Sequence, residues 1–560
     1  MAQKTTSLKS TSQKSQKSAS HKARRTTARR PAEPVGHVER ERKYEGDAAA
    51  ALPSLTDVPL SAGEHGGPGG KTAAGTNGLL TAVSADSESL RAVYYDTPDL
   101  RLLARRITLR RRTGGHDAGW HLKLPTADGA RLELHLPLDA STSTADPDAP
   151  PHVPAEFLAR VRAYVRDGRL APVARLATER RRTLLTDGAE RTLVELADDS
   201  VTAQALDPAG AVRHAESWHE VEAELVDGDL PLLDAVEQRL LGAGLRRSAS
   251  ASKLARALGP TAPTQPEAGR TTDSSPGSIG ALLTALLRQQ VGQLLAQDAE
   301  VRRDAPDAVH QMRVSARRLR STLRVHERLL RVDEVATLEE ELRWLGHALG
   351  TARDREVLGE RLLRDLDTLE RTEHPGPIRR RLRNWSRQGY RTAWRQTMRE
   401  LEGPRYFALL DTLDALAAHP PLRGRAERPA AGEVRRLLTR EQHRACHRVA
   451  AALDLTPGTA ERDDAMHAAR RAAKRARYAG EGAAQPRFAK AMKDLQTVLG
   501  ERQDAFMAAQ ALPGLAEAAH LAGEPGFGYG VLYARQREAI TAAEAAVPAL
   551  QAAASAIRVK

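Results

Sequence analysis

The chain has 560 residues, more than one hydrophobic core usually supports, so several domains are expected. Aromatic residues make up only 3%, which argues against an extended surface for stacking nucleic-acid bases. A single cysteine, Cys446, excludes a disulfide within the chain and a zinc site of several cysteines. The formal net charge of +13 favours an anionic partner: nucleic acid, an acidic membrane surface or a phosphate polymer.

The first segment, 1–35, is predicted to be a disordered basic tail. Residues 1–31 carry Lys and Arg but no Asp or Glu, and so polar a sequence cannot bury apolar surface. We expect the segment either to bind a polyanion without specificity or to act as a solubilising tail. No apolar run is long enough to cross a bilayer and no signal-peptide core follows Met1, so we predict a cytoplasmic protein.

The second segment, 36–258, carries the signature of a β-domain. Polar residues occupy every second position in several short runs, which is the period of a strand. The runs are 37–44, 107–113, 120–125, 130–138, 190–197 and 217–226. Within this domain, 61–77 is predicted to be a flexible insertion and 141–151 a loop, while 259–278 has no periodicity and is predicted to be an interdomain linker.

One face of the first strand is strongly charged. Glu39, Glu41 and Lys43 alternate, so they lie on one face of a strand. Three ionisable groups are too costly for a closed apolar core, so this face is either solvated or lines a charged cavity.

Other strands favour the cavity. Glu220, Glu222 and Glu224 share one face, and the opposite face of this strand is apolar and suited to pack on helices. The acidic face is therefore predicted to line a lumen. Arg and Lys pairs at alternate positions of other strands add cations. Carboxylates can hold Mg²⁺ or Mn²⁺, and Arg and Lys can hold phosphate oxygens.

These residues resemble the CYTH family, the triphosphate tunnel metalloenzymes, over about 36–258. The resemblance is carried by the ExExK strand, by the segment 94–125 and by Ser252-Lys253. It implies an antiparallel β-barrel with catalysis by Glu39, Glu41 and Lys43. It implies metal ligation by Glu39, Glu41, Glu222 and Glu224, helped by Glu195 or one of Asp198 and Asp199, with Glu220 and Glu222 as the alternative pair. It implies phosphate contacts by Lys43, Arg110, Arg112, Lys123, Arg182 and Lys253, with Arg180 as the alternative to Arg182.

The last segment, 279–560, is predicted to be helical, because apolar residues recur every three to four positions. It contains an internal repeat: the pattern of 310–320 recurs at 467–477, and that of 349–354 recurs at 499–504. Two motifs repeated in the same order predict two similar helical bundles. On a helix, each copy of the first motif forms a narrow basic stripe: His310, Arg313, Arg317 and Arg320, then His467, Arg470, Lys474 and Arg477.

A stripe of like charges resists its own formation, so it implies a bound anion or nearby acidic partners. The motifs resemble the CHAD family (conserved histidine α-helical domain) over about 279–560. The resemblance implies two four-helix bundles that bind inorganic polyphosphate. The two stripes are expected to form the binding groove, with His310 and His467 as phosphate donors or metal ligands; donors are preferred, because no acidic residue lies inside either stripe. Gln503 departs from the pattern, because the first repeat has Arg353 at the equivalent position.

The whole chain is therefore expected to be a multidomain α+β protein that acts on phosphoanions. The leading hypothesis is metal-dependent hydrolysis of inorganic triphosphate or short polyphosphate in the barrel, with polyphosphate tethered by the helical domain. The rival is a non-catalytic scaffold associated with polyphosphate granules, and a third option is a class IV-type adenylate cyclase. A nucleic-acid partner is secondary, because no element that reads bases is evident.

Overall fold

The computed structural model describes residues 34–46, 52–56, 58, 80–85, 87–126, 129–138, 152–263, 275–370, 372 and 377–559. Residues 1–33 of the predicted tail, the predicted insertion 61–77, the predicted loop 141–151 and positions 264–274 of the linker lie outside these residues. The first strand begins at Val35, the last position assigned to the tail. Among the described helices, none has the length and apolar character needed to cross a bilayer.

The N-terminal region is an antiparallel β-sheet domain. In the described part of the chain, eleven strands form one sheet. The strands are β1 (Val35–Glu39), β2 (Glu41–Glu45), β3 (Thr81–Ser84), β4 (Glu88–Asp96), β5 (Thr108–Thr113), β6 (Gly119–Pro125), β7 (Arg131–Pro137), β8 (Ala171–Thr186), β9 (Thr192–Leu206), β10 (Val212–Leu225) and β11 (Arg246–Arg247).

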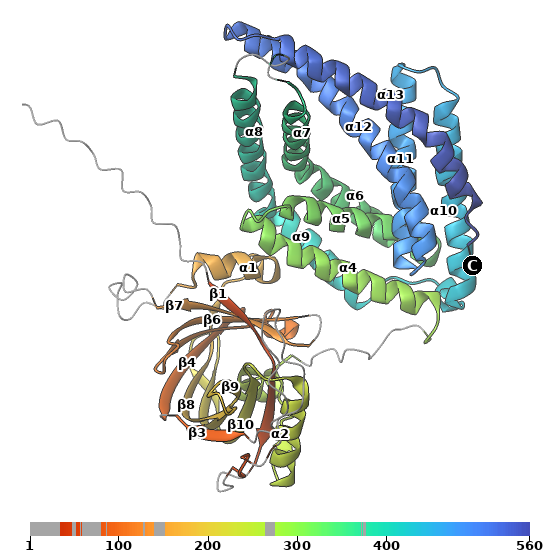
Figure 1. The fold of residues 1–560 in the computed structure, drawn as a ribbon. Helices are drawn as coiled ribbons and strands as arrows, with labels where there is room; N and C mark the ends of the chain where they lie inside the picture. Colours follow the sequence, from red (N-terminus) through yellow and green to blue (C-terminus); the bar gives the residue numbers. More distant parts are fainter. Residues whose placement is uncertain are drawn as a thin grey trace, which may run out of the picture.

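One stretch of chain pairs near both ends of this sheet. The strand order is β1-β7-β6-β5-β4-β8-β9-β10-β2-β11, with β3 paired to β8. Only Arg40 separates β1 from β2, yet β1 pairs with β7 and β2 pairs with β10. Figure 1 shows the strands curving around one another below the helical half.

Helices cover the apolar outer face of the sheet, which leaves the polar positions of the strands facing inward. Helix α1 (Ala155–Val165) buries Phe157 and Val161 against strands β4 to β7. Helix α2 (Leu230–Gly242), capped by Asp229, packs on the apolar face of β10 at Val221 and Ala223. The short helix α3 (Lys253–Leu258) packs beside Trp218. Each fully buried apolar side chain contributes roughly 1.5–3 kcal/mol.

The C-terminal region is all-helical, as its 3.6-residue apolar period predicts. Its helices are α4 (Ile279–Arg302), α5 (Ala308–Val325), α6 (Val332–Ala348), α7 (Gly350–Asp367), α8 (Ile378–Leu401), α9 (Pro404–Ala418), α10 (Ala430–Leu453), α11 (Ala460–Gly482), α12 (Pro486–Leu521) and α13 (Phe527–Ala556). The two copies of the sequence repeat lie on α5 and α11, and these helices contact each other.

Helix α1 joins the two regions by packing on α4 (Figure 1). Tyr164 packs against the cores of both regions. Arg166, which is 4% exposed, pairs with Asp411 and Asp414 of α9. Removing one partner of a buried ion pair lowers stability strongly, because the other charge stays buried without compensation. These contacts therefore fix the position of the β-domain on the helices.

Candidate functional site

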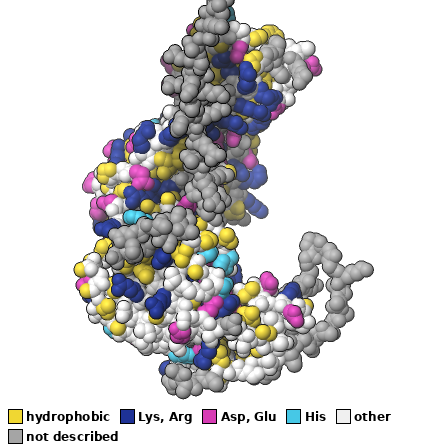
Figure 2. Space-filling model, turned by 90° about the vertical axis from the view of Figure 1, so that its left-hand side faces the viewer, with side chains coloured by type: hydrophobic (Ala, Val, Ile, Leu, Met, Phe, Trp, Pro, Cys, Tyr) yellow, Lys and Arg dark blue, Asp and Glu magenta, His cyan; other side chains and the backbone are white. Residues whose placement is uncertain are grey.

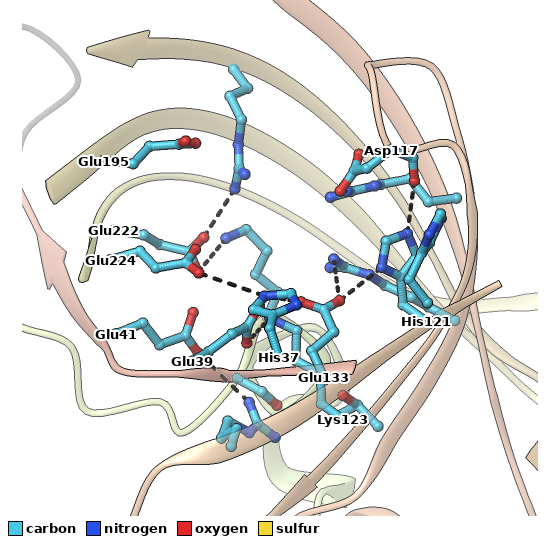
Figure 3. Close-up of a pocket in the computed structure, with 18 of the residues that line it drawn as sticks. His37, Glu39, Glu41, Asp117, His121, Lys123, Glu133, Glu195, Glu222 and Glu224 are labelled. Atoms are coloured by element: carbon cyan, nitrogen blue, oxygen red, sulfur yellow. Dashed lines mark hydrogen bonds and ion pairs between the residues drawn. The ribbon is translucent and has the colours of Figure 1, made fainter. Parts of the chain in front are cut away.

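The β-domain encloses a charged cavity of about 330 Å³, whose labelled side chains converge in Figure 3. The alternation that points apolar side chains at the covering helices points the charged ones into this space. Twelve of the residues predicted from the sequence line it: Glu39, Glu41, Lys43, Arg110, Arg112, Lys123, Arg180, Arg182, Glu195, Glu222, Glu224 and Lys253.

On one side of the cavity, cations neutralise the carboxylates closely. The Lys253 ammonium lies 3.0 Å from Asp199 and 2.7 Å from Glu222, and it also contacts Glu220. Arg180 donates to both oxygens of Asp199 at 2.8 and 2.6 Å and to Glu222 at 2.9 Å. Burial alone would lower the pKa of Lys253, but Glu222 and Asp199 outweigh burial and raise it.

On the other side, carboxylates outnumber cations. The Lys123 ammonium lies 2.6 Å from Glu39 and 3.4 Å from Glu133. His37 lies 3.5 Å from Glu39 and 3.9 Å from both Glu133 and Glu224. Burial, with the neighbouring carboxylates, raises the pKa of Glu39 to about 8 against the pull of Lys123, and burial raises that of Glu224 to about 7.

Two groups of side chains in this region have ligand atoms close enough to hold one metal ion. In each group the ligand atoms lie within 4.8 Å of one another: His37, Glu39 and Glu133 in one, Asp199, Glu220 and Glu222 in the other. Lys253 and Arg180 already compensate the second group. A divalent cation fits the first group better, because its bound charge would favour the ionised form of Glu39, whose pKa is raised first by burial and then by neighbouring carboxylates.

Two predicted metal ligands do not line the cavity. Asp198 faces the outer side of β9, where it pairs with His219 and lies 3.0 Å from Arg181. Counting by twos from Glu195 puts Asp199, not Asp198, on the inner face, so Asp198 does not line the cavity. Glu220 does point inward but is 2% exposed and does not line the cavity. It accepts a hydrogen bond from Trp218 Nε1 at 2.6 Å.

Several cavity residues were not predicted. Glu133 of β7 is the most central, because it contacts Lys123 and His121 (Nδ1 at 2.7 Å). Arg131, Glu133 and His135 alternate along their strand in the same way as the charged residues of the first strand. This alternation could have been used to predict Glu133 from the sequence. The other residues not predicted include His37, Glu88, Tyr94, His116, Asp117 and His121.

In the helical region, four predicted residues come together where α5 meets α11. We call Arg313, Arg317, Arg470 and Lys474 the α5–α11 cluster. Burial, together with repulsion from Arg317, Arg470 and Arg313, lowers the pKa of Lys474 to about 6. The repeat is visible in the packing, since Gly350 lies against Arg313 as Gly500 lies against Arg470.

Acidic side chains offset part of this charge. Arg313 lies 2.8 Å from Asp354, and Arg470 lies 3.9 Å from Asp504. Both acids come from the second repeated motif, so the repeat supplies the acidic partners as well as the basic stripe. Figure 2, in which the side of the helical half that carries α8 faces the viewer, shows Lys and Arg side chains gathered on this half.

The four remaining members of the stripes lie outside the cluster. Burial and then Arg353 lower the pKa of His310 to about 4, so this imidazole is neutral near pH 7. His467 Nδ1 lies 3.0 Å from Gln503 Oε1, so Gln503 provides a partner for the histidine. Arg320 lies near other arginines, and Arg477 pairs with Glu481 at 2.7 Å.

Comparison with known proteins agrees with both halves of this description. The CYTH domain model matches residues 72–257, and the CHAD domain model matches residues 285–513. Uncharacterized proteins from two strains of Mycobacterium tuberculosis are 37% identical over 518 residues, covering 90% of this chain and 94% of theirs. The chain therefore belongs to the family of proteins in which a CYTH domain is followed by a CHAD domain.

Solved structures are similar to parts of the chain. PptA from Streptomyces chartreusis is 26% identical, with a TM-score of 0.42, over 49% of this chain and 99% of its own. The CHAD domain from the plant Ricinus communis is 26% identical, with a TM-score of 0.41, over 50% of this chain and 93% of its own. A putative adenylate cyclase from Bacillus halodurans is 18% identical, with a TM-score of 0.24, over 30% of this chain and 82% of its own.

Proposed function

We propose that the chain is a metal-dependent phosphohydrolase that acts on inorganic triphosphate or short polyphosphate in the β-domain and binds polyphosphate through its helices. The observation that carries this proposal is the cavity, where carboxylates and Arg or Lys side chains from nearly every strand face one another. Carboxylates suit a hard divalent cation, and the cations suit a row of phosphates. CYTH domains are triphosphate tunnel enzymes, which supports the same activity.

The proposal includes a closed barrel. Because β1 and β2 are one stretch of chain that pairs with β7 and β10, residues 35–45 join the two sides of the sheet. It also includes domains at 36–258 and 279–560, the latter built from two four-helix repeats. The corresponding sets are α4 to α8 and α10 to α13, in which the single helix α12 takes the place of α6 and α7, because the repeated motifs lie on them in the same order.

Each side of the cavity has a separate role in this proposal. Glu39, Glu41 and Glu224, with Glu133 and His37 nearby, would hold Mg²⁺ or Mn²⁺. When bound, such an ion polarises phosphate oxygens and activates water. Water adds to the terminal phosphorus while the bridging P–O bond breaks, giving orthophosphate and a chain shorter by one phosphate.

The phosphates themselves would be held by the cavity cations: Lys43, Arg110, Arg112, Lys123, Arg180, Arg182 and Lys253. Arg112 pairs with Asp117 and Arg110 lies 3.8 Å from Glu133, yet both arginines also lie close to other cations. Burial, followed by Arg110 and Arg180, lowers the pKa of Arg112 to about 9, a sign of crowded positive charge. Such crowding is relieved when an anion binds.

The helical half would concentrate the substrate. The α5–α11 cluster, flanked by His310, Arg320, His467 and Arg477, presents positive charge that a polyphosphate would neutralise. Tethering a polymer beside the cavity raises its effective concentration there without any new contact in the active site.

The test is phosphate release from inorganic triphosphate with Mg²⁺ or Mn²⁺. We expect release by the wild type and a loss of at least roughly a hundredfold in Glu39→Gln/Glu41→Gln, because the charge-stabilising site is removed. Asp198→Asn is the matched control, since this carboxylate faces outward. If neither metal supports phosphate release while polyphosphate binding is retained, the non-catalytic scaffold is the better hypothesis. If ATP is converted into a cyclic nucleotide, the adenylate cyclase is the better hypothesis.

A further inference from the structure

The wall of the β-domain has a seam along one edge of β2. On that side β7 pairs only with Val35–Glu39, and β11 pairs only with Tyr44 and Glu45. Directly after β11, Ser248 N–H donates to the Lys43 carbonyl at 2.9 Å, and among the described strands none pairs with residues 40–42 along this edge. The wall there is closed by side chains rather than by a neighbouring strand.

A second cavity, of about 370 Å³, lies at this seam, and we call it the seam cleft. It adjoins the charged cavity, because Glu39, Glu41, Lys43, Arg131 and Ser252 line both. Arg131 spans the two spaces: one guanidinium nitrogen lies 3.7 Å from Glu41 and another donates to the Arg106 carbonyl at 3.1 Å. A side chain, not the backbone, is therefore what separates the cleft from the cavity at this point.

The lining of the seam cleft is strongly basic. Arg40, Arg42, Arg106, Arg131 and Arg247 line it, against two carboxylates that belong to the charged cavity. Acids of α2 offset part of this charge, since Glu237 pairs with Arg247 and lies 3.3 Å from Arg42. Arg106 is exposed and makes no ion pair with a described residue. An anion is the ligand that such a cleft attracts.

Neutral groups narrow the class of anion further. Ser248, Ser250 and Ser252 line the cleft beside the arginines. The Ser248 hydroxyl donates to Glu45 and the Ser252 oxygen caps α3, which leaves the hydroxyl protons of Ser250 and Ser252 to donate to a ligand. Its described lining contains no aromatic side chain, and the apolar contribution is limited to aliphatic residues. A nucleoside or another ring would find no stacking partner here, whereas a phosphate would find both charge and hydroxyl donors.

We infer that the seam cleft binds phosphate groups of an inorganic polyphosphate chain that extends beyond those held in the charged cavity. The inference rests on the proposed function and narrows its substrate: chains longer than triphosphate use both spaces, with Arg131 at their junction. Triphosphate fits within the charged cavity and does not need the cleft.

The first test compares two substrates in the full chain: inorganic triphosphate and a long-chain polyphosphate. Arg106→Glu reverses a charge that belongs only to the cleft. We expect it to lower kcat/KM for the long chain by roughly tenfold, since one charge-assisted contact is lost, with kcat/KM for triphosphate changed less than about twofold. Arg106→Lys restores the charge and should restore long-chain activity.

The matched control is Arg213→Glu, an exposed arginine of β10 outside both cavities. It should leave the ratio of the two activities unchanged. An equal effect of Arg106→Glu on both substrates, or no effect on either, would overturn the inference. Absence of hydrolysis in the wild type would instead contradict the proposed function.

A second measurement decides the inference without turnover. Amide hydrogen exchange of the full chain, with triphosphate and with long-chain polyphosphate, reports occupancy of the cleft directly. We expect long chains, but not triphosphate, to protect segments 103–106 and 246–250. Loss of this protection in Arg106→Glu, with protection of α5 and α11 unchanged, separates the cleft from the helical cluster. No protection of either segment by long chains would overturn the inference.

Discussion

The charged cavity and the α5–α11 cluster both collect arginine and lysine, but they balance this charge in opposite ways. In the cavity, cations face carboxylates at ion-pair distance, as Lys253 faces Asp199 and Glu222. In the cluster, Lys474 lies among arginines that lower its pKa, and the acids Asp354 and Asp504 sit at its margin. The first arrangement suits the binding of both a metal and an anion that we propose, and the second suits an anion alone.

The difference suggests a division of labour. A site with paired charges of both signs is organised before the substrate arrives, so binding costs little reorganisation. A site with excess positive charge stores repulsion that a polyanion relieves, which favours capture over chemistry.

The largest effect is expected from breaking the balance in the cavity. Lys253 is 8% exposed and contacts three carboxylates. Lys253→Met removes the cation that Glu220 contacts and leaves Asp199 and Glu222 to the remaining cations such as Arg180, and we expect a loss of about 3–5 kcal/mol in the stability of the β-domain. Calorimetry of the unfolding transition measures it.

The control for that change is an exposed pair on the same domain. Arg181→Ala removes the partner of Asp198 on the outer face, where Arg181 is 71% exposed. Exposed pairs contribute about 0–1 kcal/mol, so the transition should barely move. Similar losses in both variants would mean that the cavity pairs do not carry the stability assigned to them.

A second prediction uses the pH dependence of the cluster. The pKa of Lys474 is about 6 in the folded protein and 10.5 when unperturbed, so the unfolded chain binds the extra proton between these values. This group's contribution to stability therefore rises with pH from 6 to 10.5. Polyphosphate favours the charged form, so binding takes up a proton and weakens by up to about tenfold per pH unit above 6.

Titration calorimetry in buffers of different ionisation heat measures this proton uptake. Lys474→Arg keeps the charge and should remove the pH dependence. Lys490→Met is the control, because Lys490 is exposed and paired with Asp494 on α12. If affinity for polyphosphate does not vary between pH 6 and 9 in the wild type, Lys474 does not titrate on binding.

The smallest expected effect comes from removing an acid at the margin of the cluster. Asp354→Asn frees Arg313 from its partner, so polyphosphate should bind roughly two- to fivefold more tightly at low salt, with a steeper salt dependence. Asp494→Asn changes the net charge equally at a distant pair. Equal gains in both variants would show a general charge effect rather than release of Arg313.

The rule that alternate residues of a strand lie on the same face predicted many of the residues that line the cavity. Glu39, Glu41 and Lys43 alternate, and the structure brings them together with Glu222 and Glu224 because β10 pairs with β2. Applied strictly, the same alternation would have placed Asp199 rather than Asp198 on the inner face and would have identified Glu133 as a residue of the cavity. Sequence periodicity was sufficient wherever a strand alternates strictly.

Contacts between distant elements could not be predicted in this way. Lys253 reaches Glu220 and Glu222 only because α3 lies beside β10, and Arg166 reaches Asp411 only because α1 packs against the helical half. The repeat predicted that α5 and α11 are equivalent, but not which of their side chains come together. The seam cleft depends on where the pairings of β7 and β11 stop, which no local pattern encodes.

The most direct test of the division between the two regions is one experiment with two readouts: phosphate release from inorganic triphosphate and binding of long-chain polyphosphate. We expect Glu39→Gln/Glu41→Gln to lose release and keep binding, and Arg313→Gln/Lys474→Gln to keep release and lose binding. The account would be contradicted if either double variant lost both phosphate release and polyphosphate binding. It would also be contradicted if Glu39→Gln/Glu41→Gln still released phosphate.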